Sequence, residues 1–87
     1  MEIVYTDKSL EDLLYWKKSG NVAIQRKISR LVEAIKVDPY TGIGKPEQLK
    51  YNLAGFWSRR INQEHRIIYD VLDDKQTVEI LSLKGHY

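Results

Sequence analysis

The segment from residue 24 to residue 35 constrains the fold more than any other part of this sequence. Its apolar side chains recur at helical spacing, at Ile24, Ile28, Leu31, Val32 and Ile35. Because such positions share one face of an α-helix, the segment predicts an amphipathic helix that packs against a core. Asp38-Pro39 ends this helix, since the residue before a proline is disfavoured in the helical region.

Two shorter elements are predicted before this helix. Residues 2–6 alternate and are rich in β-branched and aromatic side chains, which predicts a strand. Ser9 and Asp12 resemble a capping box that opens a helix. One face of that helix carries Leu10, Leu13, Leu14 and Lys17. Gly20 suits its C-terminal cap and Asn21 suits the next N-terminal cap, so the two helices are expected to form an α-hairpin.

After residue 46 the pattern changes from helical to strand-like. Gly42, Gly44 and Pro46 mark a loop. Beyond it, four runs have strand character, at residues 49–53, 56–61, 66–72 and 78–83. Short turns join these runs, so neighbouring strands must be antiparallel. The prediction is a single α+β domain over residues 1–87, with the N-terminal strand and the α-hairpin packed on an antiparallel β-sheet.

Positive charge is concentrated in the second half of the chain. The net charge is +2, and residues 45–66 hold five basic side chains against two acidic ones. A localised basic segment is typical of a phosphate-binding surface. An exposed strand edge rich in Lys and Arg is the other interpretation, and charge alone favours it.

Several classes of site are disfavoured by what the sequence lacks. It has no cysteine, which excludes disulfides, thiolate metal sites and cysteine nucleophiles. It shows neither a P-loop nor spaced histidine and acidic ligands, so we expect no metal and no cofactor. An N-terminus without a basic start or a long apolar run predicts no secretory signal and no membrane span, in keeping with a cytoplasmic protein.

Polar side chains that could carry chemistry gather in the sheet half. They are Glu47, Lys50, Arg59, Arg60, His65, Arg66, His86 and Tyr87. Metal-free RNA cleavage needs a base for the 2′-hydroxyl, a cation for the phosphate and an acid for the leaving oxygen, and Glu, Arg and His suit those roles. Tyr87 or Trp57 would stack an unpaired base. His65 is assigned no role.

Each of these residues also has a structural interpretation. Glu47 is then an ordinary exposed residue, and Arg66 pairs with Asp70 or Glu64. Trp57 belongs to the core, and the last two residues form a frayed end. On spacing alone, the chain is a small basic α+β domain for which RNA binding is one candidate function.

A resemblance to a known family goes further. The central block of YoeB toxins, a branch of the RelE superfamily, is similar to three segments of this chain: Gly44-Lys45-Pro46-Glu47-Gln48-Leu49-Lys50, Leu53-Ala54-Gly55-Phe56-Trp57-Ser58-Arg59-Arg60-Ile61 and Glu64-His65-Arg66. Leu14-Tyr15-Trp16 and the closing His86-Tyr87 also match that family. The resemblance covers essentially the whole chain and implies the RelE-like microbial ribonuclease fold.

The resemblance implies a role for each matching residue. Glu47 corresponds to the general base, Arg66 to the arginine that stabilises the phosphate in the transition state, and His86 to the general acid. Tyr87 corresponds to the C-terminal tyrosine that helps to build the site. Phosphate-contacting or supporting basic residues are implied at Lys50, Arg59 and Arg60. The implied reaction is metal-independent attack of the 2′-hydroxyl on the adjacent phosphate, giving a 5′-hydroxyl fragment and a 2′,3′-cyclic or 3′-phosphate end.

The resemblance also implies partners. Toxins of this kind cleave messenger RNA at the A site of the 70S ribosome, are held inactive by a cognate antitoxin protein, and in some cases form homodimers. This chain departs from the family in one place: several members have Tyr before the final His-Tyr, whereas here the residue is Gly85. The change removes an aromatic contact and is expected to loosen the backbone beside His86.

Two alternative functions stay open. An RNA- or ribosome-binding translation inhibitor without catalysis would also explain the basic segment, and it predicts arrest with intact messenger RNA. Some relatives of the same fold inhibit DNA gyrase instead, because fold does not determine function. The complete set Glu47, Arg66, His86 and Tyr87 argues against the gyrase alternative.

Overall fold

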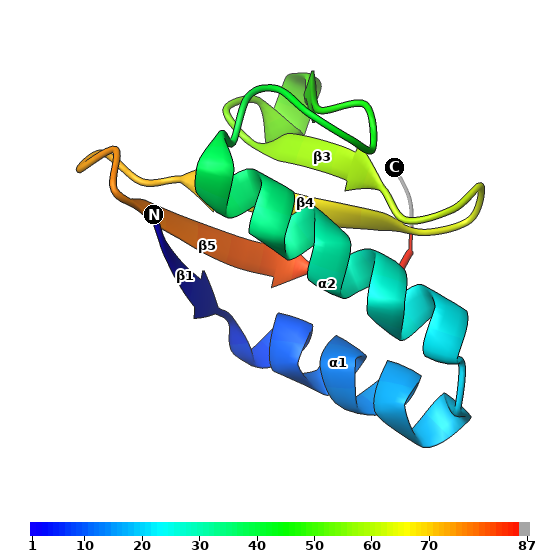
Figure 1. Ribbon diagram of the computed structural model, residues 1–87. Helices are drawn as coiled ribbons and strands as arrows, with labels where there is room; N and C mark the ends of the chain where they lie inside the picture. The colour runs from blue at the N-terminus through cyan, green and yellow to red at the C-terminus, as the bar shows by residue number, and fades with distance from the viewer. Residues whose placement is uncertain (86–87) are drawn as a thin grey trace.

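The computed structural model describes residues 1–85, and His86 and Tyr87 lie outside the described residues. In chain order the elements are β1 (Glu2–Tyr5), α1 (Asp7–Ser19), α2 (Val22–Val37), β2 (Glu47–Gln48), the 3-10 turn η1 (Tyr51–Leu53), β3 (Trp57–Arg60), β4 (Arg66–Val71) and β5 (Thr77–Ser82). Figure 1 shows α2 running across the front of the sheet with α1 beside it. The α+β class and the packing of an α-hairpin on the sheet are confirmed.

The sheet has the strand order β1-β5-β4-β3-β2. Strands β2 to β5 pair antiparallel, as the short turns predict. β1 joins at the far edge and runs parallel to β5, with Glu2 opposite Thr77, so the whole sheet is mixed. The two helices connect β1 at one edge with β2 at the other, and in the described part of the chain the opposite face of the sheet carries no α-helix.

The predicted start of the first helix is wrong, whereas the predicted break between the helices is confirmed. Thr6 is the N-cap of α1, and its side chain accepts a hydrogen bond from the Ser9 amide at 3.2 Å. Ser9 and Asp12 are therefore inside the helix, and both are buried. Gly20 adopts the left-handed conformation (φ 72) at the C-cap, and Asn21 caps α2.

The core lies between α2 and the sheet. All five residues of the predicted apolar stripe of α2 are buried, and they belong to one cluster with Ile67, Tyr69, Val78 and Ile80 of the sheet. Removing each such aliphatic side chain from water contributes about 1.5–3 kcal/mol. The expected apolar face of α1 is different: Leu10 and Leu14 are 50% and 49% exposed, whereas Trp16 faces the core.

The segment after the long loop departs from its predicted strand. β2 is only two residues long, with Glu47 opposite Ser58, and residues 51–53 form η1 instead of a strand. Tyr51 has a positive φ of 60, which is incompatible with an extended strand. The predicted strands at residues 2–6, 56–61, 66–72 and 78–83 are confirmed, with bounds that differ by at most one residue at either end. No helix within residues 1–85 is both long enough and apolar enough to cross a membrane.

Candidate functional site

The sheet brings Glu47 and Arg66 together across 19 positions of sequence. Nη1 of Arg66 lies 3.9 Å from Oε2 of Glu47 and donates to Oγ of Ser58 at 3.4 Å. Ile67, which follows Arg66, packs in the core under the helices. Because side chains alternate along a strand, Arg66 points to the face that has no helices.

The contact between Glu47 and Arg66 is an open one. The Glu47 side chain is 59% exposed, and that of Arg66 is 23% exposed. An ion pair of this exposure contributes at most about 1 kcal/mol to stability. A phosphate could therefore replace the carboxylate on the guanidinium at small cost. The alternative pairing of Arg66 with Asp70 or Glu64 is not observed among the described ion pairs.

Arg60 neighbours Arg66, and Lys50 lies near Glu47. Arg60 is exposed at the end of β3 and is the direct cross-strand partner of Arg66. Two like charges directly opposite each other destabilise a sheet, so a bound anion would relieve their repulsion. Lys50 is exposed and borders a shallow hollow together with Glu47 and Tyr51.

Arg59 points the other way and is fully buried. Its Nη2 donates to the carbonyl oxygens of Asp38 and Thr41 at 2.6 and 2.8 Å, and Nη1 donates to that of Ile43 at 3.1 Å. Its Nε donates to the Tyr69 hydroxyl at 3.1 Å. These bonds satisfy a charge that would otherwise be costly to bury. Arg59 was expected to be a phosphate-contacting or supporting residue. Because it has no exposed surface, it is not placed to contact RNA, and it instead holds the loop between α2 and β2.

The chain before His86 is anchored beside Arg66. The Gly85 amide donates to Nδ1 of His65 at 3.0 Å, and the Arg66 amide donates to the Gly85 carbonyl at 2.9 Å. Gly85 has a φ of 103, where a side chain would be strained. These two hydrogen bonds hold Gly85 itself, and the expected loosening beside His86 stays a prediction. His86 and Tyr87, the predicted acid and tyrosine, lie outside the described residues.

Sequence reasoning missed His65, Lys27 and Lys45. His65 makes the contact to Gly85, and both lysines border the same concave surface as Arg60 and Arg66. The basic segment included Lys45, but no sequence signal connects Lys27 on α2 with the strands. Trp57 packs against Tyr40 with ring centroids 5.1 Å apart, so its ring already has an aromatic neighbour.

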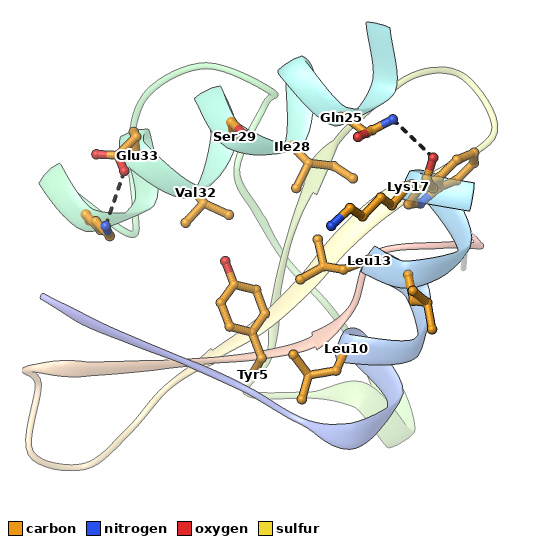
Figure 2. A pocket seen from close by; sticks show the side chains of 12 residues that line it. Tyr5, Leu10, Leu13, Lys17, Gln25, Ile28, Ser29, Val32 and Glu33 are labelled. Carbon is orange, nitrogen blue, oxygen red and sulfur yellow. Dashed lines mark hydrogen bonds and ion pairs between the residues drawn. The ribbon is translucent and has the colours of Figure 1, made fainter. Parts of the chain in front are cut away.

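A different cavity, of about 590 Å³, lies on the helix side of the protein. Figure 2 shows Tyr5, Leu13 and Val32 pointing into this space between the two helices. None of the described candidate site residues borders it. Within residues 1–85, no group of three or more histidine, aspartate or glutamate side chains could hold a metal ion.

Comparison with known proteins identifies the family. The sequence model of the family described as YoeB-like toxin of bacterial type II toxin-antitoxin system matches residues 5–87. The chain is 42% identical to toxin YoeB of Escherichia coli strain K12 over 87 residues, the full length of both chains. The chain belongs to the YoeB toxin family. It is thus a toxin of a type II toxin-antitoxin system, and the resemblance drawn from its central block is confirmed.

Solved structures of YoeB proteins share the fold along the whole chain. The YoeB/ParE toxin from Agrobacterium tumefaciens has a TM-score of 0.93 and 39% identity, with 100% of both chains covered. The YoeB dimer from Staphylococcus aureus has a TM-score of 0.87 and 40% identity, with 100% of this chain and 98% of that chain covered. The S. aureus protein is also known in a heterotetrameric YoeB-YefM toxin-antitoxin complex, with a TM-score of 0.86, 40% identity and the same coverage.

Proposed function

We propose that this YoeB-family toxin is an endoribonuclease that cleaves messenger RNA at the A site of the ribosome. The observation that carries the proposal is the Glu47–Arg66 contact of 3.9 Å on the open face of the sheet. It places a carboxylate and a guanidinium within reach of one phosphodiester. Gly85, the residue before His86, lies beside this pair, because its carbonyl oxygen accepts a hydrogen bond from the Arg66 amide.

The chemistry needs only side chains. Glu47 accepts the proton of the 2′-hydroxyl as that oxygen attacks the adjacent phosphorus. Arg66 donates to the phosphate oxygens, where negative charge accumulates in the transition state. The bond from phosphorus to the 5′-oxygen breaks, and His86 gives that oxygen its proton while Tyr87 helps to orient the substrate. The products are a 5′-hydroxyl end and a 2′,3′-cyclic phosphate, which water can open to a 3′-phosphate.

The open geometry of the site supports dependence on the ribosome. Within residues 1–85, Glu47 and Arg66 border two different shallow hollows rather than one enclosed cleft. Such a surface orients a flexible single strand poorly, and orientation supplies much of the rate of a catalysed reaction. A messenger already held at the A site would arrive oriented, so we place the toxin there and, with the ribosome, in the cytoplasm.

Two protein partners belong to the same proposal. The S. aureus relative assembles with YefM, and we propose that a cognate antitoxin likewise holds this toxin inactive. The basic open face would suit an acidic antitoxin segment that folds on binding. A homodimer is proposed from the dimer of the same relative.

A reconstituted translation system tests the catalytic function. New messenger 5′ ends would be mapped on programmed ribosomes for the wild type and for Glu47→Gln, Arg66→Ala and His86→Ala, with Glu11→Gln on α1 as an exposed control. Cuts within the A-site codon should slow about 10²- to 10⁴-fold in the Glu47→Gln and His86→Ala variants. Arrest without new ends in the wild type would instead favour a non-catalytic translation inhibitor.

A further inference from the structure

A concave surface of about 540 Å³ lies next to the proposed cleavage site. Its lining includes four cations, Lys27, Lys45, Arg60 and Arg66, and no acidic side chain. We propose that this basic hollow binds the messenger backbone beside the cleaved linkage, with Lys27 and Lys45 contacting a flanking phosphate. The inference rests on the proposed function and deepens it.

The fold brings these cations together through Gly44. A Cβ at Gly44 would lie 2.6 Å from Cδ2 of Leu31 and 3.3 Å from the Arg60 carbonyl oxygen, so only glycine lets the loop approach this closely. The Gly44 carbonyl also accepts from the Arg60 amide at 2.7 Å. The loop is thereby pressed between α2 and β3, which places Lys45 next to Arg60.

Lys45 adopts a positive φ of 53, which is unfavourable for a side-chain-bearing residue. Such a conformation costs about 1 kcal/mol or more and persists only where the surroundings impose it. Here the hydrogen bond and close packing of Gly44 impose it. The contacts of Gly44 therefore hold Lys45 at the hollow in spite of its unfavourable backbone conformation.

In the part of the chain that the structure describes, three of the four charges of the hollow have no neighbouring carboxylate, and only Arg66 has one, in Glu47. Within residues 1–85, no acidic oxygen lies within 4.0 Å of the charged groups of Lys27, Lys45 or Arg60, and Arg60 faces Arg66 across the sheet. Holding these like charges together is unfavourable, and Glu47 offsets only the charge of Arg66, so an anion bound beside Lys27, Lys45 and Arg60 would lower the repulsion. A phosphate group supplies that anion and the hydrogen-bond acceptors that lysine and arginine require.

Continuity with the cleavage site favours RNA over other anions. Arg66 belongs to both surfaces, since it contacts Glu47 and also lines the hollow. A chain whose cleaved phosphate lies at Arg66 carries further phosphates on either side, and one of them reaches the hollow. The amide side chains of Asn62 and Gln63 at the rim can donate to ribose hydroxyls or phosphate oxygens.

The first test measures cleavage on programmed ribosomes as a function of toxin and salt concentration. Lys27→Gln and Lys45→Gln should each raise the half-saturating toxin concentration about five- to tenfold, lower the salt slope by about 1, and leave the rate at saturation unchanged. Arg26→Gln is the matched control, because Arg26 is an exposed cation one residue away on α2 that does not line the hollow. Unchanged half-saturation and salt slope in both lysine variants would overturn the proposal.

A second test asks which RNA supplies the phosphate. Single neutral methylphosphonate linkages would be placed beside the A-site codon of the messenger. A neutral linkage at the phosphate that Lys27 contacts should weaken binding of the wild type but not binding of Lys27→Gln. If Lys27→Gln binds more weakly but no neutral linkage has an effect that depends on Lys27, the hollow binds ribosomal RNA and the proposal is overturned. A variant that loses only antitoxin binding would also overturn it.

The same variants distinguish this inference from the proposed function. Ribosome binding measured with Glu47→Gln protein needs no cleavage. Lys27-dependent binding to the messenger, with no cleavage by the wild type, would support the RNA-binding role of the hollow and refute the proposed nuclease activity. Cleavage that is unchanged in the Lys27 and Lys45 variants would support the nuclease activity and refute the RNA-binding role of the hollow.

Discussion

The Gly85 amide donates a hydrogen bond of 3.0 Å to Nδ1 of His65, which joins the segment after β5 to the residue that precedes β4. The Trp16 ring packs edge-on against the His65 ring, with centroids 4.8 Å apart, and its Nε1 donates to the Leu83 carbonyl at 2.9 Å. Helix α1 and the β3–β4 turn thus hold residues 83–85 from two sides. The residue that leads into His86 is positioned by a histidine for which the sequence suggested no role.

Replacing His65 should show that its ring acts as a hydrogen-bond acceptor. His65→Leu removes the acceptor and leaves the Gly85 amide unpaired, so the free energy of unfolding in urea should fall by about 1–3 kcal/mol. His65→Asn keeps an acceptor near the position of Nδ1 and should lose less. Equal losses in the two variants would show that the ring contributes through packing alone.

Arg59 should determine stability rather than RNA affinity. Arg59→Met leaves the carbonyl groups of Asp38, Thr41 and Ile43 without their donor, and we expect a loss of about 2–4 kcal/mol in urea unfolding. Arg30→Met, at an exposed position on α2, should change little. Under conditions where the Arg59 variant remains folded, its salt slope for ribosome binding should equal that of the wild type; a decrease of about 1 would restore Arg59 as a phosphate contact.

Stability should fall in alkaline solution because of Tyr69. Burial raises the pKa of the Tyr69 hydroxyl, and the hydrogen bond from Arg59 opposes this in part. The unfolded chain, with a pKa near 10, then releases the proton first, so the stabilisation is complete below about pH 10 and is lost as the pH rises toward the folded value. Urea midpoints measured from pH 8 to 11 should decline.

Tyr69→Phe provides the control for that pH series. Its midpoint should be lower at pH 8, since the hydroxyl donates to the Pro39 carbonyl at 2.5 Å. Its decline with pH should be shallower but still present, because burial also raises the pKa of Tyr5. Identical slopes in the two proteins would contradict a titration of Tyr69.

The two helices should respond differently to loss of a leucine. Leu31 on α2 is fully buried, and Leu31→Ala should cost about 2–5 kcal/mol of unfolding free energy. Leu10 on α1 is 50% exposed, and Leu10→Ala should cost about 1 kcal/mol or less. Comparable losses measured by urea unfolding would mean that the Leu10 face of α1 is packed after all.

The sequence by itself determined the features that depend on near neighbours. The stripe of α2, the break at Gly20-Asn21 and four of the strands (β1, β3, β4 and β5) follow from short-range periodicity and local backbone preference. The central block from Gly44 to Arg66, together with Leu14-Tyr15-Trp16 and the closing His86-Tyr87, indicated the family that the comparison confirms. Each of these signals lies within a continuous stretch of chain, where the spacing of residues already fixes their relative positions.

For α1 and β3, only the tertiary structure decided which side of the element is buried. Asp12, rather than Leu10, faces inward on α1 because its carboxylate accepts from the distant Leu83 amide at 2.9 Å. Adjacent arginines differ in the same way: Arg59 points under the helices and Arg60 to the open face. Local periodicity cannot supply these outcomes, because the partners that satisfy or repel each polar group come from parts of the chain that meet only when the sheet forms.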